Sequence, residues 1–146
     1  MKPVTCGFRP EMTAEVFNGR GVGHLPGLVG VQILSVTPGG LESRLVVRRD
    51  LLAPNGFLHA ATVVALADTS CGYACVANLP QGASGFTTIE IKSNFLGTAL
   101  DGAIFCRATP AHLGRTTQVW DAVVTIEGTE KRIALFRCTQ MVLWPK

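Results

Sequence analysis

The sequence has few charged residues and few aromatic ones. Asp, Glu, Lys and Arg make up 16% of its 146 residues and aromatic residues 7%, whereas apolar residues make up 47%. This charged fraction is low for the surface of a monomer, so we expect part of the apolar surface to be buried between subunits. The length fits one domain of ordinary size. We therefore expect a single domain that forms an oligomer.

Long basic runs are absent as well, although the formal net charge is +3. The longest are the pairs Arg48-Arg49 and Lys131-Arg132, and no aromatic residues are interleaved with them for base stacking. Nucleic acid is therefore not an expected partner.

The five cysteines include no Cys-x-x-Cys pair and have no histidine nearby at metal-ligand spacing. The sequence thus indicates neither a zinc site nor a disulfide framework. Dispersed cysteines in odd number are typical of free thiols in a reducing cytoplasm, which is the expected location. No metal and no bound cofactor is expected.

The sequence also shows no recognisable secretory signal and no segment that we expect to span a membrane. Met1-Lys2 is not followed by an apolar stretch of the kind that a secretory signal needs. The one run of membrane-spanning length, Leu58 to Leu79, contains His59 and Asp68. An aspartate in mid-span costs about 2.5–3.5 kcal/mol, so we expect a helix buried in protein and no membrane partner.

Turn residues separate a short arm from the rest of the chain. Residues 1–27 are rich in glycine and proline, and helical character is predicted only around Glu11 to Phe17. The stretches Gly19 to Gly23 and Pro26-Gly27 are predicted to be loop. The glycine spacing does not predict a nucleotide-binding loop, because no strand comes before it and no helix after it.

Residues 28–146 have the pattern of one α+β domain. The apolar run from Ala60 to Asn78 is long enough for a helix, and Leu79-Pro80-Gln81-Gly82 ends it. The predicted strands are Val29 to Val36, Leu41 to Arg48, Gly85 to Leu96, Ala103 to Ala111, Thr116 to Glu127 and Arg132 to Leu143. A mostly antiparallel six-stranded sheet with one long helix packs most economically when the sheet wraps around the helix.

The third predicted strand has the clearest alternation. Its odd-numbered residues, from Thr87 to Phe95, are expected on one apolar face, and its even-numbered residues, from Thr88 to Asn94, on the other.

Asp68 is the one charged residue in the apolar run from Ala60 to Ala77. An unpaired charge is costly inside a packed helix. Either donors such as Thr62, Thr69 and Ser70 hold this carboxylate, or it takes part in chemistry. Cys71 is a poor alternative nucleophile, because an apolar helix disfavours its thiolate and no histidine stands at a compatible position.

The segment Gly56-Phe57-Leu58-His59, with Asp68 nine residues after the histidine, resembles the motif of the hotdog-fold acyl-CoA thioesterases, in particular the PaaI-like, phenylacetate-degradation branch. Thr87 to Leu96 and His112 to Thr116 resemble further segments of that family. The resemblance runs from about Leu28 to Leu143 and implies a single hotdog domain over residues 28–146.

Two positions depart from the family pattern. The paired glycines after the histidine are Ala60-Ala61 here, and the family's asparagine position is Ala53, with an asparagine at Asn55 instead. Alanine still offers a backbone N–H, and Asn55 is the candidate replacement for the side-chain donor.

Thioester hydrolysis needs a donor that polarises the carbonyl and an anion that attacks it or activates water. Free amide groups at the start of the predicted helix, at Ala60 and Ala61, supply the donor. The resemblance implies that Asp68 is the nucleophile or general base and that His59, Asn55 and Thr88 position the reactants. The structural alternatives are a helix-capping role for His59 and a strand-surface hydroxyl at Thr88. The residues expected to bind substrate or CoA are Gly56, Phe57, Leu58, Ala61, Gly114, Arg115 and Thr116.

The Arg115 guanidinium suits phosphate oxygens, and its alternative is a solvated arginine in a hairpin turn. A pocket of Phe57, Leu58, Val64 and Phe95 would accept aromatic or medium aliphatic acyl groups. These residues do not decide between the two.

Asp68 lies about 10 Å beyond Ala61 by helical rise, too far to meet the start of its own helix. The resemblance implies a dimer with antiparallel central helices, in which Asp68 of one subunit meets the helix N-terminus of the other. We expect at least a homodimer and favour a homotetramer of two dimers, but the sequence does not decide between the two.

Two other functions fit the same fold. A non-catalytic acyl-CoA or lipid-binding protein is suggested by Ala60-Ala61 and by the displaced asparagine. An enoyl-CoA hydratase would need a second polar residue on the helix of Asp68, and the sequence has none at a suitable place.

Overall fold

The computed structural model describes residues 7–146, so Cys6 and the start of the predicted arm lie outside the described residues. Two short helices come first, then a hairpin, a 3-10 turn, a long helix and four strands. Their bounds are α1 Ala14–Gly21, α2 Leu25–Val29, β1 Val31–Thr37, β2 Gly40–Val46, η1 Arg49–Leu51, α3 Ala60–Ala77, β3 Gly85–Phe95, β4 Ala103–Leu113, β5 Thr117–Ile126 and β6 Arg132–Leu143.

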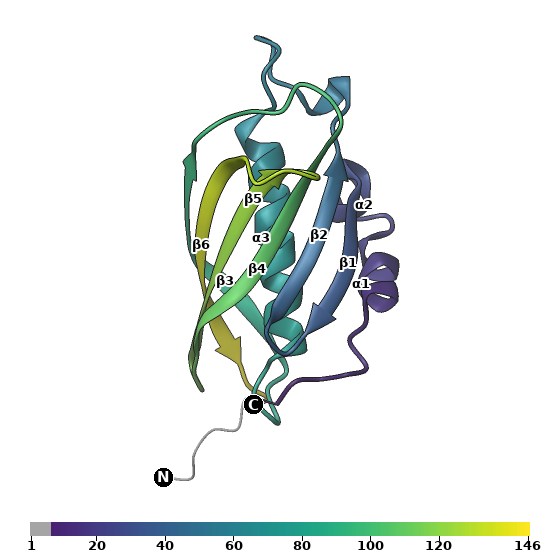
Figure 1. The fold of residues 1–146 in the computed structure, drawn as a ribbon. Helices are drawn as coiled ribbons and strands as arrows, with labels where there is room; N and C mark the ends of the chain where they lie inside the picture. The colour runs from purple at the N-terminus through teal and green to yellow at the C-terminus, as the bar shows by residue number, and fades with distance from the viewer. Residues whose placement is uncertain (1–6) are drawn as a thin grey trace.

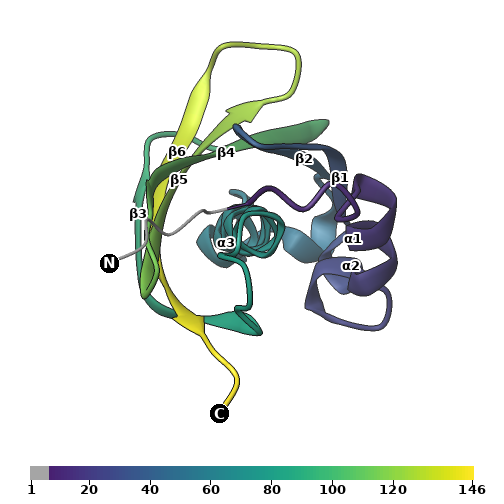
Figure 2. The same ribbon diagram turned by 90° about the horizontal axis from the view of Figure 1, so that it is seen from below.

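The strands form one antiparallel sheet in the order β1-β2-β4-β5-β6-β3, and the sheet curves around α3 (Figures 1 and 2). Leu66, Cys71 and Cys75 of α3 are fully buried against inward-facing strand residues such as Ile104 and Trp120. The predicted α+β architecture, a six-stranded sheet around one long helix, is confirmed. The predicted strand ends differ by no more than two residues from those observed.

The N-terminal arm differs from the prediction. Gly19 and Gly21 belong to α1, and Pro26-Gly27 belong to α2, so the predicted loops there are wrong. Tertiary packing decides the conformation, because Phe17 is fully buried. A side chain at Gly27 would place its Cβ 2.3 Å from the carbonyl oxygen of Gly21, so only glycine allows the two helices to approach this closely.

The two edge strands of the sheet differ in whether their free backbone groups are covered by another element. At the β1 edge, the Asn18 side chain of α1 accepts from the Ile33 N–H at 2.8 Å and donates to the Ile33 carbonyl at 3.0 Å. This amide occupies backbone groups that another strand would otherwise pair with. The β3 edge has no such cover within residues 7–146, and Ile91 and Phe95 are about half exposed there.

A β-bulge in β3 changes which residues share a face. The pairing with β6 runs from Thr88↔Gln140 directly to Glu90↔Thr139, so the register shifts by one residue. Thr88 therefore shares the inward face with Ile91, and Thr87 points outward. The predicted strict alternation from Thr87 to Phe95 is wrong at its first half, because an inserted residue reverses the side-chain period.

One face of α3 is not covered by the sheet. Figure 2 shows the sheet curving around one side of the helix. The edge strand β3 and the α1–α2 pair border the side that the sheet leaves open. The residues that stay partly exposed there are Ala61, Val64, Ala65, Asp68, Thr69, Tyr73 and Val76. By length and apolarity α3 is a possible membrane span, but its packing inside the sheet accounts for this composition.

Candidate active site

Asp68 lies in the middle of the uncovered face of α3. Its Oδ1 atom is buried and has no hydrogen-bond partner among residues 7–146. Burial raises the pKa of Asp68 above its ordinary value of 3.8. Thr62 and Ser70 do not hold this carboxylate, because they donate to the carbonyls of Leu51 and Leu66. Such a carboxylate is a stronger base than a solvated one and is not explained by a structural partner.

A cavity of about 230 Å³ opens beside Asp68. Its floor is the open face of α3, and its walls come from β3 on one side and from α1 and α2 on the other. The lining residues are Arg20, Pro26, Asp68, Thr69, Gly72, Tyr73, Val76, Phe86 and Thr88. Asp68 and Thr88 line the same cavity, because the bulge in β3 puts Thr88 on the inward face.

The Thr88 hydroxyl donates to Oε1 of the fully buried Gln140 at 2.7 Å. This bond fixes the hydroxyl with its lone pairs available to accept from a water molecule. Thr88 also lines the cavity of Asp68, which is the position that a water-orienting hydroxyl would need.

Gly72 gives the cavity its depth. A Cβ at this position would lie 3.0 Å from Cζ of Phe86, so the Phe86 ring rests directly against the helix backbone. A side chain here would push that ring aside and change the aromatic wall of the cavity.

The N-terminus of α3 offers one free donor. His59 is the N-cap, and its Nδ1 accepts from the Ala61 N–H at 2.9 Å. Among residues 7–146 no acceptor bonds the Ala60 N–H, which is exposed at the helix start. The expectation that both amides are free is therefore corrected, since Ala61 is occupied and Ala60 is not. An accepting Nδ1 places the proton of the neutral imidazole on Nε2.

The loop before His59 serves mainly to shape the turn. Asn55 Oδ1 accepts from the Phe57 N–H at 3.2 Å, and Gly56 has a φ of +87°, which favours glycine. Leu58 is buried and donates its N–H to Thr98 Oγ1, while Phe57 is exposed. None of these residues lines the cavity of Asp68 in the same chain, nor do Val64 and Phe95, so its wall differs from the predicted one.

The predicted CoA loop lies elsewhere as well. Gly114 closes the turn between β4 and β5 by donating to the Thr117 carbonyl at 2.9 Å. The Arg115 guanidinium sits over the Trp144 ring at 4.6 Å from its centroid, so a structural role is visible for it. Gly114, Arg115 and Thr116 do not line the cavity of Asp68 within one chain.

Alternative chemistry at the helix finds little support. Cys71 is fully buried, and a hydrogen bond with Cys138 together with burial raises the pKa of the Cys71 thiol well above its usual range. This opposes a nucleophilic role at neutral pH. Within residues 7–146, no three His, Cys, Asp or Glu side chains come together in a cluster that could hold a metal ion.

Sequence reasoning identified only Asp68 and Thr88 of the residues that line this cavity and missed the others, among them Arg20, Tyr73 and Phe86. The Tyr73 ring stacks on Phe17 with centroids 4.4 Å apart and planes 8° from parallel, which anchors α1 to α3. No local sequence signal relates these residues to Asp68, because they meet only when α1 packs on α3.

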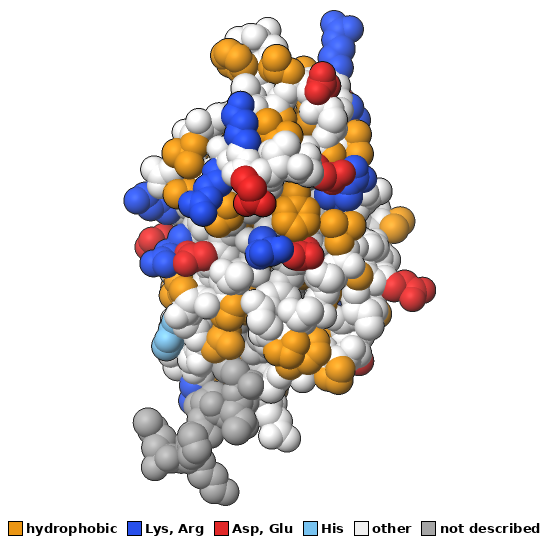
Figure 3. All heavy atoms as spheres, in the orientation of Figure 1, with side chains coloured by type: hydrophobic (Ala, Val, Ile, Leu, Met, Phe, Trp, Pro, Cys, Tyr) orange, Lys and Arg blue, Asp and Glu red, His pale blue; other side chains and the backbone are white. Residues whose placement is uncertain are grey.

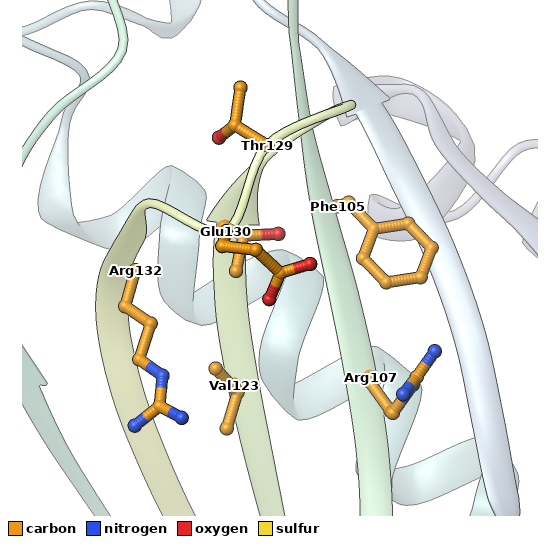
Figure 4. A pocket seen from close by; sticks show the side chains of 7 residues that line it. Phe105, Arg107, Val123, Thr129, Glu130 and Arg132 are labelled. Carbon is orange, nitrogen blue, oxygen red and sulfur yellow. The ribbon is translucent and has the colours of Figure 1, made fainter.

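The convex face of the sheet has a different character. Acidic and basic side chains are intermixed there (Figure 3), including the ion pairs Arg107–Glu42 and Arg137–Asp121. A hollow of about 260 Å³ on this face is lined by Phe105, Arg107, Val123, Thr125, Thr129, Glu130 and Arg132 (Figure 4). It lies on the far side of the sheet from α3 and contains no unpartnered buried polar atom, so it is a weaker candidate than the cavity of Asp68.

Known proteins share both the sequence pattern and the fold. Residues 55–133 match the family model described as "Thioesterase superfamily". A 1,4-dihydroxy-2-naphthoyl-CoA hydrolase of Listeria monocytogenes serotype 1/2a (strain 10403S) is 32% identical over 76% of this chain and 89% of its own. The crystal structure of a mutant of thioesterase PA1618 from Pseudomonas aeruginosa has a TM-score of 0.87 at 25% identity, covering 93% of this chain and 97% of that one. The Escherichia coli PaaI protein has a TM-score of 0.73 at 25% identity, covering 81% and 83%.

Proposed function

Because the chain belongs to the thioesterase superfamily, with the hotdog fold and a PaaI-like relationship, we propose that it hydrolyses acyl-CoA thioesters to free acids and CoA. The observation that carries the proposal is the buried, unpartnered Oδ1 of Asp68 in an open cavity. A carboxylate of raised pKa without a structural partner is suited to take a proton or attack a carbonyl.

In the proposed reaction, Asp68 takes a proton from a water molecule that Thr88 orients, and the water oxygen attacks the thioester carbonyl. A direct attack by the carboxylate is the alternative first step and leads to an acyl-Asp68 anhydride that water then hydrolyses. In both cases the carbonyl oxygen becomes an oxyanion. The C–S bond then breaks, and the CoA thiolate takes up the proton that Asp68 removed from water or, in the anhydride path, a proton released when water hydrolyses the anhydride.

The oxyanion needs a fixed donor, and the Ala60 N–H is the candidate. It is free and lies at the positive end of the α3 dipole, where backbone N–H groups stabilise anions. His59, whose Nδ1 accepts from the Ala61 N–H, comes directly before Ala60 and is proposed to position the substrate carbonyl.

The two parts of this site lie too far apart to act together within one chain. Ala60 and Asp68 are separated by about 12 Å along α3 by helical rise. We therefore propose a homodimer with antiparallel α3 helices, in which Asp68 of each subunit faces the helix N-terminus of the other. The open face of α3 and the exposed apolar Ile91 and Phe95 of the uncovered β3 edge support this arrangement. Association of two dimers into a homotetramer and a cytoplasmic location stay predictions.

The acyl group is proposed to be aromatic or a compact ring. Tyr73 and Phe86 line the cavity next to Asp68, and flat rings pack well against such walls. The Listeria relative is named for a naphthoyl-CoA substrate, and the E. coli PaaI protein is assigned to a phenylacetic acid degradation operon, which supports the same class.

The test is release of free CoA thiol from a panel of short, medium, long and aromatic acyl-CoAs, with the wild type and Asp68→Asn compared at equal folded concentration. We expect turnover of aromatic esters and a loss of about a hundredfold or more in kcat for Asp68→Asn. A loss below tenfold would contradict the role of Asp68. Absence of turnover on every ester, with binding detected by calorimetry, would favour a non-catalytic acyl-CoA-binding protein.

A further inference from the structure

The far wall of the Asp68 cavity holds an arginine that the proposed mechanism does not use. Arg20 stands in the last turn of α1 and lines the cavity together with Tyr73. Its Cζ lies 5.7 Å from the centroid of the Phe17 ring. Within residues 7–146 no carboxylate forms an ion pair with Arg20. The arginines that do form ion pairs are Arg44, Arg48, Arg107 and Arg137.

The position of Arg20 is fixed by a stack of three side chains. Phe17 is fully buried and stacks on Tyr73, so α1 cannot slide along α3 without breaking that contact. The Phe17 ring attracts the Arg20 guanidinium by a cation–π contact, with Cζ over the ring. This contact restrains the charged group beside the cavity that Arg20 lines.

Arg20 lines the same cavity as Asp68, but its charge acts on Tyr73 and not on the carboxylate. Its charge lowers the pKa of Tyr73 against the larger raising effect of burial, whereas the pKa of Asp68 responds to burial alone. Tyr73 is five residues further along α3 than Asp68, about 7.5 Å by helical rise. The acyl group of a thioester held at Asp68 would therefore extend along α3 toward Tyr73, the residue on which the charge of Arg20 acts.

We propose that Arg20 is a specificity residue that selects acyl groups bearing a carboxylate at the end remote from the thioester. This inference rests on the proposed thioesterase function and names its substrate class. In such an acyl group an aromatic ring separates the two carbonyl carbons, so that the remote carboxylate lies away from Asp68 and toward Tyr73. The ring would lie against Tyr73 and Phe86, and the remote carboxylate would accept two N–H bonds from the guanidinium fork.

The test compares kcat/KM for 4-carboxybenzoyl-CoA with that for benzoyl-CoA, which lacks only the remote carboxylate. The wild type is expected to prefer the carboxylated ester. Arg20→Met, which keeps a stem on Phe17, is expected to lower the ratio of the two values by about tenfold or more, and Arg20→Lys by less, because lysine keeps the charge without the fork. Arg132→Met, on the convex face, is the matched control and should leave the ratio unchanged.

An unchanged ratio in Arg20→Met, or a wild type that prefers benzoyl-CoA, would overturn the proposal even if the protein is a thioesterase. If no ester is hydrolysed, binding still decides the question. Calorimetry of 4-carboxybenzoyl-CoA with Asp68→Asn and with Asp68→Asn plus Arg20→Met should then give a weaker Kd for the double variant. Equal Kd values would overturn it.

Discussion

Helix α3 has two faces that differ in burial and in polar chemistry. On the face toward the sheet, Leu66, Cys71 and Cys75 are fully buried, and Ser70 bonds both the Leu66 carbonyl and the Ser43 hydroxyl. On the open face, Asp68 has a buried oxygen that finds no hydrogen-bond partner in the part of the chain that the structure describes. The Ser70 hydroxyl on the first face has its hydrogen bonds inside the fold, whereas the Asp68 carboxylate on the second face has no visible part in holding the fold together. In this helix, the sheet-facing residues contribute stability, and the opposite face is left for the residue proposed to react.

Removal of the free donor at the start of α3 is expected to have the largest effect. Ala60→Pro deletes the Ala60 N–H, and proline is well tolerated at the first helical position. His59 already has the extended backbone that the residue before a proline prefers. We expect kcat for an aromatic acyl-CoA to fall on the order of 10²–10³ while the melting temperature changes little.

Ala60→Gly is the control for that variant, because it keeps the N–H and should retain most of the activity. Full activity in Ala60→Pro would show that another group stabilises the oxyanion. It would also remove the reason for assigning a catalytic part to the helix N-terminus.

The sheet-facing side should respond to truncation through stability. Leu66→Ala leaves a cavity at a fully buried position, so the free energy of unfolding in urea should fall by about 2–5 kcal/mol. The folded fraction should keep its kcat, since Leu66 does not line the active cavity. Leu66→Met, which nearly conserves volume, should lose less than about 1.5 kcal/mol. If Leu66→Ala instead lost kcat without losing stability, the proposed division between the two faces would be wrong.

The acid limb of the pH profile should report Asp68. Burial favours the neutral carboxyl, so the pKa of Asp68 is raised and the active carboxylate is lost at a higher pH than for a solvated aspartate. We expect kcat/KM for benzoyl-CoA to be half-maximal on its acid side above pH 3.8, the ordinary value. A limb at or below that value, in protein still folded by circular dichroism, would contradict this.

The same raised pKa gives a smaller effect on stability, and its sign is fixed. The free energy of unfolding is highest below the unfolded-state pKa of Asp68, where the carboxyl is neutral in both states. It falls as the pH rises through the higher folded-state pKa, because the folded protein must then bury the charged carboxylate. Asp68→Asn has no such loss, so it should melt at a higher temperature than the wild type at neutral pH, and the difference should shrink in acid. A lower melting temperature for Asp68→Asn at neutral pH would mean that the carboxylate has a stabilising partner in the assembly.

The sequence alone predicts the helices and strands whose ends are marked by nearby turn residues or by a change in hydrophobic pattern. The apolar run after Asn55-Gly56 and before Pro80 predicts α3 to within one residue, and glycine turns delimit the strands of the second half. The same approach failed in the arm, where Gly19 and Gly21 argue locally against a helix. There Phe17 and the Gly21–Gly27 contact outweigh propensity, and such tertiary contacts cannot be read from the arm alone.

The candidate site was predicted in part for a related reason. Asp68 is detectable because a single charge interrupts an apolar run, and Thr88 because of a family resemblance. Arg20 and Tyr73 meet only after α1 folds back over α3, so nothing in their sequence neighbourhoods relates them to Asp68. The bulge in β3, which turns Thr88 inward, likewise has no clear signal in the alternation of that strand.

The central claim is that Asp68 of one subunit works with the Ala60 N–H of another. Its most direct test is a mixed dimer of Ala60→Pro and Asp68→Asn chains, carrying different tags, co-expressed and purified through both tags. Each mixed dimer would have one intact site and one site lacking both groups, so thiol release from an aromatic acyl-CoA should recover to about half of the wild-type rate per dimer. Activity that stays at the level of the single variants would contradict the claim and place both groups in separate or unrelated roles.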